Sequence, residues 1–185
     1  MFIRYKQVNV VYVDRNDGFN LNSTLTLKIL KLNKWSFISG IILLTFHSTT
    51  NNFNIKEFFY FHNFAANMQV LFMMITIILN TRLSFLTSQI TSKRIAKIRL
   101  IITLMLIIGL IFFTIMTVLS ISAFKNDFYS SARLFWKHSD GGYVYHVIAS
   151  ITQWILFFLS TSFFGTFYHE FKRIRIMKLV LLNNI

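Results

Sequence analysis

The residues of this chain that could carry chemistry are few and mostly isolated. Its five histidines are scattered: His47, His62, His138, His146 and His169. Apart from the adjacent pair His169–Glu170, none has the spacing of metal ligands from another histidine or an acid. Cysteine is absent, so there are no thiolate ligands and no disulfides. The sequence therefore predicts no metal site and no cofactor.

The sequence also lacks the signatures of the common catalytic sites. Glycine is rare, and the adjacent pair Gly141–Gly142 after Asp140 is typical of a turn rather than of a phosphate loop. No Gly-x-Ser-x-Gly elbow is present, and no Ser, His and Asp fall in an arrangement that would form one pocket. We therefore expect no catalytic residues and a protein that is not an enzyme.

A polar stripe in an apolar stretch is the more informative feature. Within "GYVYHVIASITQW" (142–154), His146, Ser150 and Gln153 are four and then three residues apart, which places them on one face of a helix. Polar groups at membrane depth face other helices and find partners there. We favour a structural role as a neutral hydrogen-bonding stripe, because the spans offer no charged partner; a ligand site or proton switch around His146 is the alternative. The structural interpretation is also favoured for three residues of the preceding apolar region: Asn67, Gln69 and Asn80.

Membrane-spanning helices are the elements that must position this stripe. The chain has 185 residues, of which 55% are hydrophobic and only 14% charged, with 22 Phe and no Pro. A soluble domain of this size rarely has such a composition. We predict an all-α, polytopic integral membrane helix bundle with four transmembrane helices. The expected spans are Trp35–His47, Phe64–Leu79 with an extension to Leu86, Leu100–Phe124 and Tyr143–Tyr168.

The expected domain organisation is a central bundle with two flanking segments. Residues 1–34 contain no spanning run and form a cytosolic N-terminal segment, in which "VNVVYV" (8–13) could be a short strand. Residues 35–168 form the transmembrane bundle, and residues 169–185 form a basic cytosolic tail.

The basic residues predict the orientation. Of the 19 Lys and Arg, only four lie outside the two flanking segments and residues 80–99: Lys56, Lys125, Arg133 and Lys137. The positive-inside rule then places both termini in the cytosol. The sequon Asn22-Ser23-Thr24 should be cytosolic and unglycosylated. The net charge of +13 thus mainly reflects topology, and we expect no nucleic-acid binding because no soluble basic domain is present.

The loop "TSKRIAKIR" (91–99) concentrates four basic residues beside a helix start: Lys93, Arg94, Lys97 and Arg99. One interpretation is contact with anionic lipid headgroups, which attract basic residues close to the membrane. The interpretation that we favour is topology alone, because short cytosolic loops generally carry this excess.

The C-terminal region resembles a known membrane-protein family. The positions that carry the resemblance, within "GYVYHVIASITQW…FFGTFYHEFKRIRI" (142–176), are His146, Ala149–Ser150, Gln153–Trp154, Thr166–Phe167 and Glu170–Phe171. In order and type they resemble the last helix of the damage-regulated autophagy modulator (DRAM) family, part of a superfamily that includes the Frag and Sfk proteins. Gln153 stands where that family carries an acid, which makes a titrating His–carboxylate pair unlikely.

The resemblance implies a six-helix fold, of which the four expected spans match the last four. The first two helices have no counterpart, and residues 1–34 match no part of the family pattern. It also implies a non-enzymatic protein of lysosomal or other endomembranes that promotes autophagy, with membrane lipids and unknown proteins as partners. The alternative is a plasma-membrane regulator of phosphoinositide kinase recruitment or lipid organisation, as in the Sfk-like branch. An enzyme that remodels lipid anchors is disfavoured, because no acid or nucleophile cluster lies near the membrane.

Overall fold

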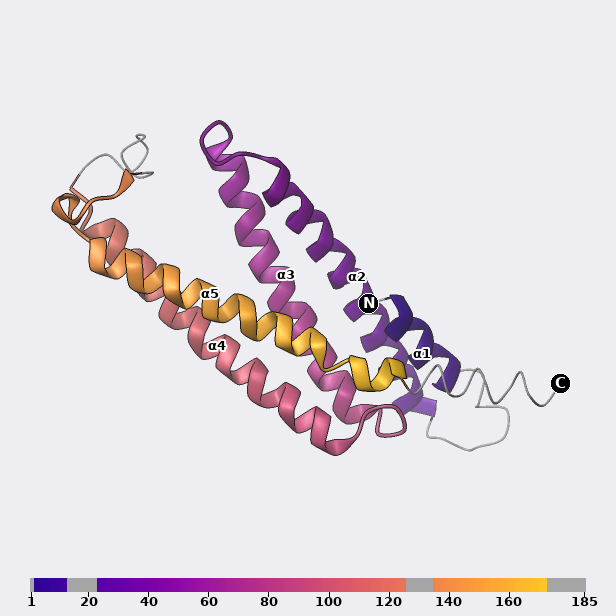
Figure 1. Ribbon diagram of the computed structural model, residues 1–185. Helices are drawn as coiled ribbons and strands as arrows, with labels where there is room; N and C mark the ends of the chain where they lie inside the picture. The colour runs from indigo at the N-terminus through magenta and orange to yellow at the C-terminus, as the bar shows by residue number, and fades with distance from the viewer. Residues whose placement is uncertain (1, 13–22, 126–134, 173–185) are drawn as a thin grey trace. The chain divides into compact units, whose positions relative to one another are not determined.

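The computed structural model describes residues 2–12, 23–125 and 135–172, and these residues are all-α (Figure 1). The helices are α1 (Phe2–Tyr12), α2 (Ser23–Asn52), α3 (Phe59–Leu86), α4 (Lys93–Ser122), the short 3₁₀ helix η3 (His138–Asp140) and α5 (Tyr143–Gly165). No strand occurs in the ranges given above.

Among the described residues, four helices are long and apolar enough to cross a membrane: Thr24–Asn52, Phe59–Leu86, Lys93–Ser122 and Tyr143–Lys172. This confirms the predicted fold class and the extension of the second span to Leu86. The first of these spans, in α2, is much longer than the expected Trp35–His47. Its polar end stays helical because side chains bond to carbonyls one turn back, as Thr49 Oγ1 does to Thr45 O at 2.9 Å and Asn52 Nδ2 to Ser48 O at 2.8 Å.

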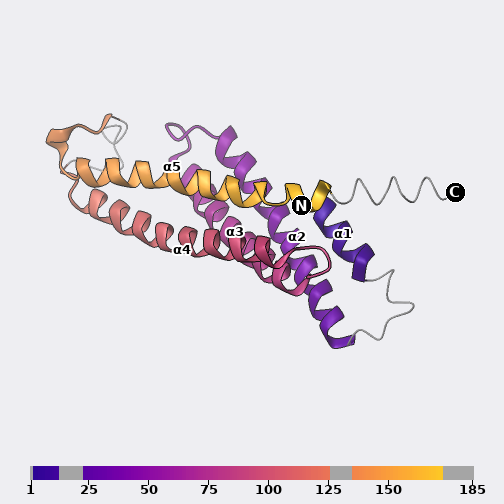
Figure 2. The ribbon, with the colours of Figure 1, turned by 60° about the horizontal axis from the view of Figure 1, so that its bottom comes forward.

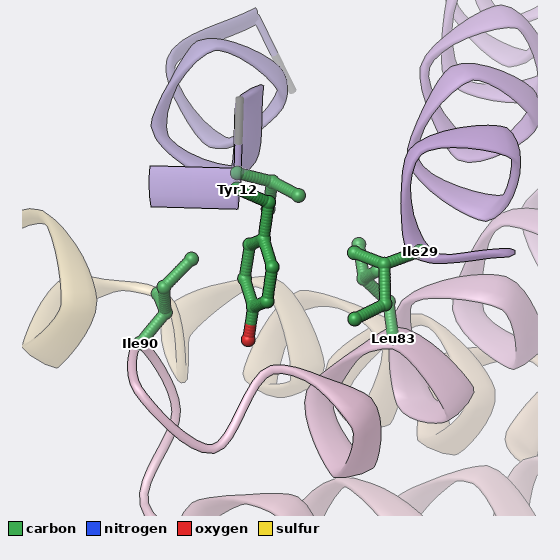
Figure 3. Close-up of a cluster of buried hydrophobic side chains, with 5 residues drawn as sticks. Tyr12, Ile29, Leu83 and Ile90 are labelled. Atoms are coloured by element: carbon green, nitrogen blue, oxygen red, sulfur yellow. The ribbon is translucent and has the colours of Figure 1, made fainter. Parts of the chain in front are cut away.

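The N-terminal segment is helical, so the expected strand at residues 8–13 is wrong over the described part, Val8–Tyr12. Val8 and Tyr12 lie one helical turn apart, and both are buried in a cluster with Ile29, Leu83 and Ile90 (Figure 3). Packing against α2 and the end of α3 therefore overrides the strand preference of a Val-rich sequence. The boundary expected after residue 34 falls inside α2. Asn22 of the sequon lies outside the described residues.

The chain forms two compact units, Met1–Leu100 with Gly165–Ile185, and Ile101–Phe164. In the first unit, α2 and α3 lie side by side and α1 packs against α2 (Figures 1 and 2). In the second, α4 and α5 run side by side in both views. Gly109 permits this closeness, because a Cβ there would lie only 2.8 Å from Leu156 Cδ2.

A glycine turn leads into α5, as the sequence predicts. Gly141 and Gly142 have φ values of 79° and 66°, which are unfavourable for residues with a side chain. A Cβ at Gly142 would also lie 2.3 Å from the carbonyl oxygen of Ser120. The indole Nε1 of Trp136 donates a 2.7 Å hydrogen bond to Gly141 O, which holds the segment before the turn.

Buried polar side chains join α2 to α3. Asn80 Nδ2 donates to Ser36 Oγ at 2.7 Å, and Thr76 Oγ1 donates to Ser39 Oγ at 3.0 Å. All four side chains are buried. Ser84, one turn beyond Asn80, donates its hydroxyl to Asn80 O at 2.7 Å. These bonds specify which faces of the two apolar helices meet, in a setting where apolar contact alone discriminates poorly.

We predict that Asn80→Leu lowers the free energy of unfolding by about 1 kcal/mol, the scale of one interhelical hydrogen bond in a membrane protein. The loss should be modest, because the buried Asn80 Oδ1 has no hydrogen-bond partner in the structure and leucine removes that acceptor too. Asn67→Leu is the matched control, since Asn67 lies on the same helix but is exposed and bonds only to Asn63 O. Chemical unfolding of both variants in detergent measures the difference; equal losses would contradict the assignment.

Candidate functional site

The chain buries a cluster of three charged side chains where the end of α5 meets α1 and the start of α4. After Gly165 the chain makes a turn at residues 166–167 and is helical again to residue 172. This places Glu170 between two guanidinium groups. It forms ion pairs with Arg4 and with Arg99, the latter at 2.8 Å from Nη1 to Oε1. The relative exposure of Arg4, Arg99 and Glu170 is 2%, 0% and 1%.

Hydroxyl groups from the α3–α4 connection complete the contacts of Glu170 and Arg4. Thr91 Oγ1 donates to Glu170 Oε1 at 2.7 Å and accepts from Arg4 Nη2 at 3.1 Å. Arg4 Nη2 also lies 3.4 Å from Thr87 Oγ1. Both threonines are buried. The α3–α4 connection is therefore bonded to α1 and to the C-terminal end of the last span at once.

Arg99 is bonded to two further hydroxyls. Its Nε donates to Thr166 Oγ1 at 2.8 Å, and its Nη1 donates to Ser84 Oγ at 2.6 Å. Because Ser84 in turn bonds to the backbone of Asn80, the cluster is continuous with the polar contacts between α2 and α3.

The aromatic ring of Phe167 lies against both guanidinium groups. Arg99 Cζ is 3.8 Å and Arg4 Cζ is 5.5 Å from its centroid. Two cations and one anion leave the three side chains with a net charge of +1, and the negative face of an aromatic ring stabilises such an excess. Thr166, Phe167 and Glu170, which carry the family resemblance, thus each contact one or both of these arginines.

Burial does not remove the charge of Arg4. Burial lowers the pKa of the Arg4 guanidinium to about 10, an effect that the Glu170 carboxylate opposes and the Arg99 guanidinium adds to. A pKa of about 10 still leaves Arg4 protonated at neutral pH. The arrangement therefore supplies charge compensation. No group of three or more His, Asp or Glu suited to a metal ion occurs in the part of the chain that the structure describes.

The predicted polar stripe of α5 lies in the second unit and includes none of the residues of the ionic cluster. The His146 ring stacks on Trp136 with centroids 4.4 Å apart, and Ser150 Oγ donates to His146 O of the same helix at 2.9 Å. Gln153 is exposed rather than turned inward as expected. His146 and Ser150 help to line an open hollow of about 490 Å³, together with Trp154. The structural role of the stripe stays a prediction.

The four basic residues at the start of α4 do not share one environment. Lys93, Arg94 and Lys97 are exposed, whereas Arg99 is buried and paired with Glu170. The expected contact with anionic lipids therefore stays a prediction for Lys93, Arg94 and Lys97. Arg99 belongs to the ionic cluster and lies in the first residues of α4, which are part of the first unit.

Sequence reasoning missed the cluster, because the local sequence gives only weak signals of it. Glu170 is the last acid of the chain and is followed by Lys172, Arg173 and Arg175, so it looks like a surface residue of a basic tail. Arg99 directly precedes the uncharged run Leu100–Phe124. Neither signal identifies Arg4, which is 166 positions from Glu170.

Comparison with known proteins identifies the family. The family model described as the Frag1/DRAM/Sfk1/Cwh43P N-terminal domain matches residues 1–174. The chain belongs to this family. The match includes the segment with Arg4, so the expectation that residues 1–34 match no part of the family is wrong. The Arg4–Glu170 ion pair thus connects the two ends of the matched region.

The curated relatives carry the same family name. The chain is 28% identical to DNA damage-regulated autophagy modulator protein 2 of Mus musculus over 180 residues, and 28% identical to the Homo sapiens protein of that name over 179 residues. Each alignment covers 94% of this chain and 61% of the relative, so the chain spans about three fifths of the length of these relatives. No solved structure matches.

We predict that Glu170→Gln destabilises the protein by about 3–5 kcal/mol, the cost of removing one partner from a buried ion pair. The variant leaves two buried guanidinium groups facing a neutral amide. Glu57→Gln is the matched control, because Glu57 is an exposed acid in the α2–α3 connection. Thermal unfolding of the purified proteins in detergent measures both changes. A Glu170→Gln variant as stable as Glu57→Gln would show that the cluster does not stabilise the fold.

Proposed function

We propose that this protein is a non-enzymatic, DRAM-like multi-pass protein of lysosomal or other endomembranes that promotes autophagy. The observation that supports this most is the family match over residues 1–174. The curated relatives are named autophagy modulators, which supports a role in autophagy. The four helices of membrane-spanning length support a multi-pass membrane protein.

The contacts of Glu170 support a structural rather than a catalytic role for the cluster. The carboxylate accepts from Arg4, Arg99 and Thr91, and all three donors are buried with it. A general base needs a position within hydrogen-bond reach of a substrate proton. A carboxylate that is buried between two guanidinium groups is shielded from a substrate. We therefore propose that the cluster keeps the cytosolic end of the protein in one conformation.

The subcellular location of the protein tests this proposal. We expect a protein tagged at its own locus to co-localise with a lysosomal or late-endosomal marker, and its deletion to slow the turnover of an autophagosome marker during starvation. Re-expression of the wild-type chain or Glu57→Gln should restore turnover, whereas Glu170→Gln should not. A signal confined to the plasma membrane would contradict the proposal and favour a regulator of phosphoinositide kinase recruitment or lipid organisation.

A further inference from the structure

The N-terminal part of α2 carries a row of exposed basic and apolar side chains. We call the following residues the α2 basic stripe: Leu27, Lys28, Lys31, Lys34 and Trp35. All five are exposed, with relative exposures of 66% for Leu27 and 54% for Trp35. Their spacing of three, four and seven residues aligns them along one face of the helix.

The opposite face of the same helix segment is buried. Ile29 packs with Val8 and Tyr12 of α1, and Asn33 Nδ2 donates to Tyr5 O at 2.9 Å and to Asn9 Oδ1 at 3.0 Å. Helix α1 thus covers one side of α2 and leaves the α2 basic stripe on the other. The orientation of the lysines is therefore fixed by packing, since the helix cannot rotate without breaking these contacts.

The α2 basic stripe lies where a membrane surface is expected. Residues 23–34 precede the apolar run that begins at Trp35, and 12 helical residues extend about 18 Å. Tryptophan is enriched at the level of the lipid headgroups, and lysine side chains near a helix end extend toward the same level. Leu27, one turn from Lys31, adds an apolar side chain of the kind that inserts at this interface.

The charge of this region is not compensated by nearby acids of the described structure. In the described part of the first unit, the acids are Glu57 and Glu170. Glu57 follows the opposite end of α2, and Glu170 is buried between Arg4 and Arg99. Neither of these two described acids therefore compensates the charge of the three lysines.

We propose that the α2 basic stripe binds the anionic phospholipids of the adjoining leaflet. The ammonium groups of Lys28, Lys31 and Lys34 contact the headgroup phosphates and carboxylates, while Leu27 and Trp35 insert among the lipids. The positive-inside rule accounts for an excess of lysine on this side of the membrane. It does not account for the alignment of all three lysines with an exposed leucine and tryptophan on the face that points away from α1.

Quenching of Trp35 by brominated lipids tests this proposal. The other two tryptophans are replaced by Trp136→Phe and Trp154→Phe, and the protein is reconstituted in phosphatidylcholine nanodiscs. Equal mole fractions of brominated phosphatidylserine or brominated phosphatidylcholine are then compared. We expect brominated phosphatidylserine to quench Trp35 about twofold more strongly, because the lysines enrich anionic lipid locally, and salt should reduce this preference.

The variant Lys28→Gln/Lys31→Gln/Lys34→Gln should lose the preference for phosphatidylserine. The matched control Lys93→Gln/Arg94→Gln/Lys97→Gln removes the same charge from the exposed start of α4 and should keep it. Equal quenching by the two lipids in the parent protein, or a preference that survives the α2 substitutions, would overturn the proposal.

A second probe avoids the tryptophan substitutions, which remove the ring that stacks on His146. The chain has no cysteine, so Thr24→Cys at an exposed position of α2 can carry a single fluorophore in an otherwise native protein. The same lipid comparison with the same lysine variants should show the same preference and the same loss. Equal quenching of this fluorophore by the two brominated lipids would also overturn the proposal.

Discussion

A charge that is removed from water must be compensated where it lies, and this constraint governs the part of the chain around Glu170. Two guanidinium groups and one carboxylate are almost fully buried, and each would be strongly unfavourable alone. The carboxylate is shared, other guanidinium nitrogens bond to threonine and serine hydroxyls, and the Phe167 ring lies against both cations. The three charges can therefore be buried only when all of these elements are in place.

This requirement explains why segments distant in the sequence converge. Arg4 comes from α1, Thr91 from the α3–α4 connection, Arg99 from α4 and Glu170 from the end of the last span. Each apolar helix could pack in several rotations, because lipid and helix surfaces are equally apolar. Buried ionic and polar contacts exclude the arrangements that would leave charges unpaired. They thereby determine which faces meet, and the docking of α1 leaves the lysines of α2 exposed.

The parts of the structure that follow from local sequence could be predicted, and those that depend on distant partners could not. Uncharged runs such as Leu100–Phe124 predicted the spans, because hydropathy alone decides membrane insertion. Helix α1 was missed because the burial of Val8 and Tyr12 depends on residues distant in the sequence, among them Ile29, Leu83 and Ile90. The cluster was missed because an acid in a basic tail looks exposed until Arg4 and Arg99 are placed beside it. The exposed position of Gln153 likewise depends on which face of α5 is covered, and periodicity alone does not decide that.

The coupling between Arg4 and Glu170 tests most directly whether buried charge compensation holds the two ends of the matched region together. A double-mutant cycle with Arg4→Met, Glu170→Gln and the double variant, followed by chemical unfolding in one detergent, measures it. If the two side chains compensate each other, the loss in the double variant should fall short of the sum of the single losses by about 2 kcal/mol or more. Losses that add, with no coupling energy between the two positions, would contradict the account.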